Sequence, residues 1–381
     1  MFAFLLLSGV AFVQAKDWTG NIDNDWNNAG NWSPNGVPDN STDVTIPDVS
    51  PSPDLTATGV NGTVGSLEVQ TGATITVGTQ TLTVDDAGGL SGNLTTNGAN
   101  AFSISDGSLL VDGASSLAGD IQATGAATIS FSGAVTLDGG ITIDLVTVGG
   151  SITLGSTVDA TTAGSESLTV DAGSGSVTLS GSIGGTALGN LTVAAGGPID
   201  LPAVMLNGNL DVSSTGGAIT DSGAQSVPGT TTLNADDGAG TYYDITLDTS
   251  TNDFDAGGSG DATSITSAQN VTLVDANGIT LGASTVQSLL SVDAGGNIAQ
   301  SAAVTSGSLE LVSGGTVALT NTSNNTGTVA ADLTSGTGSF SYTDVDALSI
   351  NSVNFTDGIA TAGAPIDVTT INGTLTVTDA G

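Results

Sequence analysis

Carboxylates are the main reactive side chains of this chain, which has 37 Asp and Glu residues, a single Lys, and no Arg, His or Cys. Three close acidic pairs could do chemistry: Asp236-Asp237, Asp253 with Asp255, and Asp344 with Asp346. Two carboxyl groups about 5 to 9 Å apart can hydrolyse a glycosidic bond without any cation. Each pair lies among turn-forming residues, however, where an Asp side chain normally binds the local backbone. We therefore predict no catalytic residue, and a carbohydrate-active enzyme is a distant alternative.

The same acids could bind calcium, a hard cation that takes oxygen ligands from turns. The repeat of a calcium-binding β-roll contains Gly-Gly-x-Gly-x-Asp. The segment Gly257-Gly258-Ser259-Gly260-Asp261 departs from it by one position and occurs once. Calcium stays open as a cofactor, but we predict no metal-binding and no cofactor-binding residue. Because Cys and His are absent, the sequence also excludes disulfides, the usual zinc sites and thiol redox chemistry.

The charge of the chain is strongly one-sided, with a formal net charge of -36 and Lys16 as the single cation. Nucleic acid is excluded as a partner, because binding it depends on Lys and Arg displacing counterions from phosphates. The same argument of sign excludes anionic membrane surfaces. Lyases built on a parallel β-helix need Arg or Lys as the base and further cations for the uronate, and this chain lacks them.

The three tryptophans, Trp18, Trp26 and Trp32, all lie near the start of the chain, and a proline-rich segment follows them through Pro53. Large aromatic side chains beside an array that otherwise has few of them suggest a cap, because the end of a repeat array exposes apolar core and unpaired backbone. The alternative is functional: the indole rings could form a platform on which sugars stack.

The first residues have the features of an export signal. An apolar run from Phe2 to Val13 is followed by Gln14-Ala15, which predicts a signal peptide over residues 1–15 and a mature start at Lys16. The run is too short for a membrane span of about 20 residues. It lacks the usual basic start, and a buried strand is the structural alternative. We expect a secreted or cell-surface protein, associated with the outer membrane, with no membrane span in the mature chain.

From about residue 60 the sequence consists of short strands separated by Gly, Asn or Asp turns. Apolar residues alternate with Thr or Ser, so each strand should bury one face and expose the other. Examples are Thr74-Ile75-Thr76-Val77, Thr81-Leu82-Thr83-Val84, Ser151-Ile152-Thr153-Leu154, Ser167-Leu168-Thr169-Val170 and Ser176-Val177-Thr178-Leu179. Helical periodicity is absent, and strong helix formers are scarce. The chain is therefore expected to be all-β.

The strands recur with a period of 19 residues. This step separates Leu191 from Leu210, Val271 from Leu290, and Leu290 from Leu309. A unit this short cannot bury its apolar face alone, but stacked copies can. We predict a right-handed parallel β-helix, or β-solenoid, of roughly 17 coils of about 4.8 Å each. Tandem immunoglobulin-like sandwiches are the weaker alternative, because they need irregular spacing and large core aromatics.

Paired small residues mark the corner of each unit: Gly196-Gly197, Gly216-Gly217, Asn277-Gly278, Gly295-Gly296 and Gly314-Gly315. They turn the chain where a Cβ atom would clash. The outward positions vary among Thr, Asp, Ser and Glu. A flat threonine array for ice or crystal faces needs the same residue in each coil, so this function is disfavoured.

The chain resembles the filamentous-haemagglutinin-like and autotransporter-passenger β-helices of bacterial surface proteins. The resemblance is strongest over residues 190–350, in units such as Gly208-Asn209-Leu210-Asp211-Val212 followed by Gly216-Gly217. The opening segment from Trp26 to Pro38 is similar to the start of many β-strand-repeat surface proteins. Pro34-Asn35-Gly36 is only a fragment of the secretion motif of two-partner export. The resemblance implies a fold and a surface location and names no ligand.

Together these features predict a signal peptide at residues 1–15, a cap at 16–59 and solenoid repeats over 60–381 that continue beyond this sequence. The expected function is that of a non-catalytic, adhesin-like stalk for attachment to a cell surface or matrix. Its partners would be extracellular glycans, extracellular proteins or further copies of the chain. The alternative is a structural surface-layer or biofilm-matrix protein.

Overall fold

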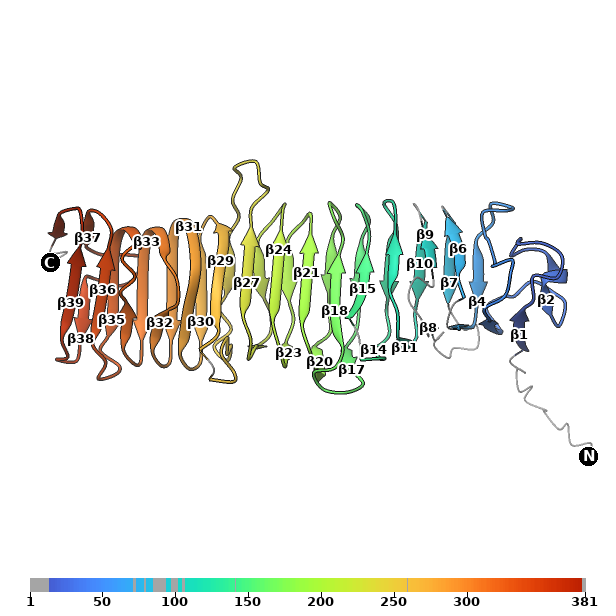
Figure 1. Cartoon of the computed structure of the whole chain (residues 1–381), viewed down its shortest axis with the longest axis horizontal. Coiled ribbons are helices and arrows are strands. Elements are labelled where there is room, and N and C mark those ends of the chain that lie inside the picture. Colours follow the sequence, from blue (N-terminus) through green and yellow to red (C-terminus); the bar gives the residue numbers. More distant parts are fainter. Residues whose placement is uncertain are drawn as a thin grey trace, which may run out of the picture.

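A computed structural model describes residues 14–70, 73–78, 80–84, 94–96, 102–104, 107–140, 142–258 and 260–378. The predicted signal peptide lies outside these residues except for Gln14 and Ala15, which open the first strand. Apart from the short 3-10 helix η1 (Ala29–Asn31), every regular element in the described part of the chain is a β-strand. The strands stack as a parallel β-solenoid of about 14 turns, which forms a long rod (Figure 1). The prediction of an all-β parallel solenoid is confirmed.

Three parallel ladders, named A, B and C, begin near the start of the rod. Ladder A contains β1 (Gln14–Trp18), β3 (Thr42–Ile46), β5 (Ser66–Val69), β8 (Leu94–Thr96), β11 (Ser115–Leu117), β14 (Val135–Leu137), β17 (Val158–Ala160), β20 (Ile183–Leu188), β23 (Val204–Leu206) and β26 (Gln225–Ser226), with β2 (Trp32–Ser33) antiparallel to β1. Ladder B contains β6 (Ile75–Gly78), β9 (Phe102–Ile104), β12 (Ile121–Ala123), β15 (Thr142–Val146), β18 (Ser167–Asp171), β21 (Leu191–Ala195), β24 (Leu210–Ser214), β27 (Thr231–Ala235) and β29 (Ala262–Ala268).

Ladder C contains β4 (Gly62–Val64), β7 (Thr81–Val84), β10 (Ser108–Val111), β13 (Thr128–Phe131), β16 (Ile152–Leu154) and β19 (Val177–Leu179). A further ladder begins beside β19 with β22 (Ile199–Leu201), β25 (Ile219–Asp221), β28 (Ile245–Leu247) and β30 (Val271–Asp275). The last coils contain three long strands, β31 (Ile279–Ala294), β33 (Val304–Ser313) and β35 (Asn325–Leu333). The shorter strands among them are β32 (Ile298–Gln300), β34 (Val317–Leu319), β36 (Phe340–Asp344), β37 (Leu348–Ile350), β38 (Ile359–Thr361), β39 (Ile366–Thr370) and β40 (Leu375–Val377).

The alternation in the sequence builds the core. In β21 the side chains of Leu191 and Val193 are buried and Thr192 between them is half-exposed. Because partners in a parallel ladder lie about 4.8 Å apart, each inward residue stacks on the inward residue of the next coil. Leu191 pairs with Leu210, and Leu290 pairs with Leu309, as the 19-residue step predicts.

The coils are longer on average than the repeat suggests. Leu67 pairs with Leu94, a step of 27 residues, and Thr231 pairs with Thr263, a step of 32 residues. In the step from Thr231 to Thr263, residues 236–244 and 248–258 form loops outside the ladders and add nothing to the length of the rod. The expectation of roughly 17 coils is therefore wrong, and the solenoid has about 14 turns.

Glycine is required where corners stack. A Cβ atom on Gly216 would overlap the carbonyl oxygen of Gly196, its counterpart one coil earlier. This corner can therefore approach the preceding one closely only because residue 216 lacks a side chain.

The three tryptophans form a cluster near the start of the rod. Trp32 packs edge-on against Trp18 and Trp26, with ring centroids 5.0 and 4.8 Å apart, and all three are buried. Their burial leaves no open indole face for a sugar, so the stacking-platform alternative is wrong. The cap over residues 16–59 stays a prediction. β1 and β3 join β5 in ladder A, so this segment shares a sheet with the coils that follow.

Candidate functional site

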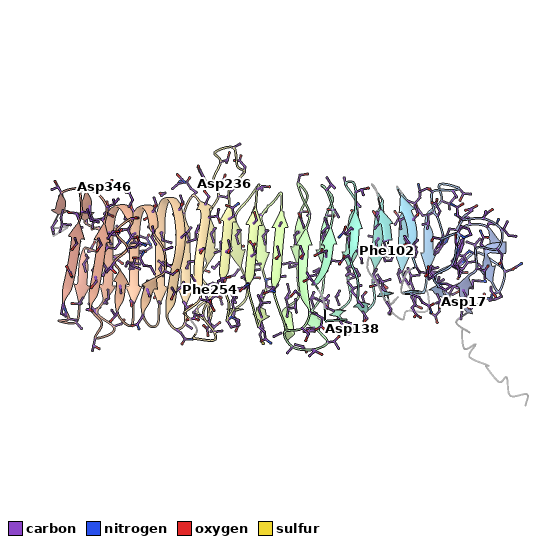
Figure 2. All side chains as sticks on the ribbon, in the orientation of Figure 1. Asp17, Phe102, Asp138, Asp236, Phe254 and Asp346 are labelled. Carbon is purple, nitrogen blue, oxygen red and sulfur yellow. The ribbon has the colours of Figure 1, made fainter. Side chains whose placement is uncertain are left out.

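The chain between β27 and β29, which are partners in ladder B, contains two loops outside the ladder. The first, residues 236–244, projects from the rod, and the second, residues 248–258, folds along it. Asp236 marks the projecting loop, and Phe254 lies in the second loop on the other side of the rod (Figure 2). Loops held by a rigid ladder are where binding groups are most often placed.

The second loop is fixed from the inside by buried groups. The side chain of Phe254 is fully buried, and its backbone N–H donates to the Asp275 carboxylate at 2.8 Å. Asn252 is also buried, donates to the Asp221 carboxylate at 2.8 Å and accepts from the Gln225 backbone N–H at 2.8 Å. The loop therefore holds a defined shape.

A groove of about 700 Å³ lies between this loop and two coil corners. From the loop, Asp253, Asp255, Gly257 and Gly258 line this groove. From the two corners, the lining residues are Ala276, Asn277, Gly278, Gly295, Gly296 and Asn297. The groove thus offers carboxylate and amide groups beside small apolar side chains such as Ala256, Ala276 and Ala299.

The groove acids also bind the protein itself. Asp253 accepts from the Asn277 amide at 3.1 Å, and Asp255 accepts from the Gly260 backbone N–H at 3.0 Å. Asp275 lies beneath them, buried, and accepts from the Phe254 and Asn277 backbone N–H groups at 2.8 Å each. Burial raises the pKa of Asp275, those two hydrogen bonds oppose the rise, and the charges of Asp253 and Asp255 add to it.

The chemistry that this groove offers is hydrogen-bond acceptance. A carboxylate has about four acceptor sites, so Asp253 and Asp255 can accept from ligand hydroxyl or ammonium groups while keeping their present bonds. Within the described residues, no three His, Cys, Asp or Glu side chains are grouped to hold a metal ion. Gly257 and Gly258 of the near-match to the calcium repeat line the groove, and Ser259 lies outside the described residues.

The other two acidic pairs serve local structure. Asp236 accepts from the Gly238 N–H at 2.7 Å, and Asp237 accepts from Ala239 and Thr241 at 2.8 Å each. Hydrogen bonds from Thr241 lead those that hold the pKa of Asp237 below its ordinary value. Both carboxylates therefore tie the projecting loop to its own backbone.

Asp344 and Asp346 do not form a pair of carboxyl groups facing one site. Asp344 is buried, where it accepts from the Thr326 N–H at 2.9 Å and the Tyr342 hydroxyl at 3.1 Å, and Asp346 is exposed. Burial, and to a smaller degree the Asp344 charge, raise the pKa of Tyr342. This site stabilises the core of the last coils.

The two neighbouring strands that contain Thr-x-Thr segments lie in different ladders. Thr76 lies in β6 of ladder B and Thr83 lies in β7 of ladder C, so they occupy different faces of the rod. They cannot belong to one flat array.

Sequence reasoning missed the site around Glu310. Its outward position in β33 predicts exposure, but the side chain is buried beneath the turn at residues 353–356. Its carboxylate accepts from Ser291 at 2.7 Å, Asn354 at 2.8 Å, Thr356 at 2.9 Å and the Phe355 N–H at 3.2 Å. Phe355, at the tip of the turn, is 93% exposed. No local signal could reveal this contact, because three of the four donors are 44 to 46 positions away.

The ladders and corners define a repeat-built parallel β-solenoid protein. In the part of the chain that the structure describes, no helix has the length and apolarity that a membrane crossing requires.

Two family models match parts of the chain. One, described as a domain of unknown function (DUF8693), matches residues 17–130. The other, described as repeats of unknown function (DUF5649), matches residues 188–258 and 268–332. No curated protein and no solved structure matches the chain.

Proposed function

We propose that the chain is an exported, non-catalytic attachment stalk, whose rod carries adhesive loops away from a bacterial cell surface or into a matrix. The observation that carries this proposal is the rod itself, a stack of about 14 turns with loops set on its flank. The acidic pairs support a non-catalytic role, because their hydrogen bonds serve the protein's own loops and core. A structural surface-layer or biofilm-matrix role is the second candidate, and catalysis is a distant third.

The charge of the chain limits the ligands of such a stalk. With a net charge of -36, anionic polysaccharides would be repelled and neutral or amino-bearing glycans and proteins would not. We place the contact with the ligand at the groove beside Asp253 and Asp255.

The test uses beads coated with residues 16–381 and a panel of glycans and extracellular proteins. We expect saturable binding to a neutral or amino-bearing member of the panel, and at least about tenfold weaker binding by the double variant Asp253→Asn/Asp255→Asn. The matched control, Asp236→Asn/Asp237→Asn, changes two acids on the projecting loop and should bind as the parent does.

Two results would contradict the proposal. Ordered self-assembly without binding to any panel member would favour the structural role, and release of sugar from the glycans would favour an enzyme. Export is tested separately, since protein recovered from the surface of the source cells should begin at Lys16 when its N-terminus is sequenced.

A further inference from the structure

One side of the rod is interrupted between β19 and β22. These strands lie side by side and both line an open groove of about 440 Å³. They are not ladder partners, although β19 pairs with β16 before them and β22 pairs with β25 after them. Val177 and Leu179, which face inward from β19, are 7% and 8% exposed, whereas Ile152 and Leu154 in β16 are 0% and 2% exposed.

Proline contributes to the interruption. Pro198 directly precedes β22 and has no N–H to donate to a neighbouring strand. A parallel solenoid is held together by bonds between consecutive coils, so a missing set of bonds weakens that interface alone.

Ladder A is irregular at the same level. Ile183 pairs with Val204, and Leu188 pairs with Leu206. Between these two pairs the chain advances five residues in β20 but only two residues in β23, so β20 bulges. Gly184, at the start of this bulge, has a φ of +88°. A bulge of this kind bends a strand and disrupts its ladder locally.

Ladder B is continuous at this level. Leu168 to Asp171 in β18 pair with Leu191 to Ala194 in β21, and all five residues of β21 pair with β24. The pairing between these two coils is therefore interrupted or irregular on two sides of the rod and regular on the third side. The match to the repeats of unknown function also begins at this level, at residue 188.

We propose that residues 177–206 form a hinge between two rigid stacks of coils, with ladder B as its spine and the gap between β19 and β22 as the side that opens. Hinges are short segments that absorb the change in backbone geometry while the flanking bodies stay rigid. This inference concerns the rod alone, so it does not depend on the proposed attachment role.

The first test measures distances between spin labels attached to pairs of introduced cysteines. Because the chain has no Cys of its own, only the introduced residues are labelled. Thr153→Cys/Thr246→Cys spans four coils across the gap, with Thr178, Asp200 and Thr220 between. The control, Thr83→Cys/Thr178→Cys, spans four fully paired coils of ladder C. Both distances should centre near about 19 Å. We expect the distribution across the gap to be at least about twice as broad, and equal widths would overturn the hinge.

The second test needs no substitution and uses amide hydrogen exchange of the full chain. The Ser180 N–H donates to Leu154 and the Ile199 N–H donates to Ala218, on the two sides of the gap. The Gly155 N–H, which donates to Phe131, and the Ile219 N–H, which donates to Asp244, make the equivalent bonds one coil further out. We expect the amides that flank the gap to exchange about tenfold faster than those two. Equal protection at all four amides would overturn the proposal even if a labelled variant failed to fold.

Discussion

Leu290 in β31 and Leu309 in β33 are direct partners in a parallel ladder, one coil apart, and both side chains are fully buried. The pairing extends over both strands, since Ser291 faces Glu310 and Val292 faces Leu311. This register follows from the 19-residue spacing, and a slip of one residue would turn the apolar row outward.

Leu290→Asp tests the assignment of inward and outward faces. The substitution places an unpaired carboxylate between stacked aliphatic rows and should lower the free energy of unfolding by several kcal/mol, on the order of 4. Thr272→Asp is the control, because Thr272 lies on the outer face and is half-exposed. Its effect should stay within about 0.5 kcal/mol in urea titrations. Equal losses for the two variants would mean that the faces are assigned wrongly.

Glu310→Gln tests the bond between β33 and the turn at 353–356. Hydrogen bonds to a charged acceptor are stronger than those to a neutral one, so the variant should lose about 1.5 to 3 kcal/mol at pH 7. Asp293→Asn is the control, because Asp293 is an exposed acid whose pKa is raised by desolvation and by the Glu310 charge. Removing it should leave stability unchanged or slightly higher.

The effect of Glu310 should depend on pH. Hydrogen bonds from Asn354, Ser291, Thr356 and the Phe355 N–H outweigh burial and hold the pKa of Glu310 below its ordinary value of 4.5. An acid whose pKa is lower in the folded state stabilises the fold above its unfolded pKa, and this stability is lost as pH falls through the folded pKa. The difference between parent and Glu310→Gln should therefore be full at pH 6 to 7 and shrink below about pH 4.5. A difference independent of pH would contradict the charged contact.

The sequence predicted the parts of the fold that depend on local spacing. The alternation around Leu191 and Leu210 identifies strands, and their 19-residue separation gives the register, because each coil repeats the same rows. The number of turns was overestimated, because inserts such as residues 236–244 lengthen a coil without leaving a periodic signal.

The candidate site was predicted only in part. Asp253 and Asp255 do lie together in a groove, but the groove also depends on Asp275 and on corners of later coils, which only the stacking brings near. Glu310 occupies an outward position of its strand and is nevertheless buried, because the turn that covers it is contributed by a later coil. The roles of the tryptophans were decided by burial, which composition cannot report.

Trp32→Ala tests the cap. Trp32 contacts both other indole rings and donates from Nε1 to the Trp26 carbonyl at 2.8 Å. Removing a buried indole should cost about 3 to 5 kcal/mol, with loss of the near-ultraviolet circular dichroism of the cluster. Val49→Ala, at an exposed position of the same segment, should change little. A stable Trp32→Ala protein would mean that the cap does not hold the first coils.

The chain is a stack of parallel coils, and cysteine crosslinking tests this architecture most directly. Thr192 and Asp211 are outward partners on adjacent coils, and Thr232 lies one coil further. A disulfide needs Cα atoms about 4.4 to 6.8 Å apart, which adjacent coils provide and coils separated by two steps do not. Mild oxidation of Thr192→Cys/Asp211→Cys should therefore give an intramolecular crosslink in nearly all molecules, and Thr192→Cys/Thr232→Cys should give none. A folded protein in which the first pair stays reduced, or the second pair crosslinks as readily, would contradict the parallel solenoid.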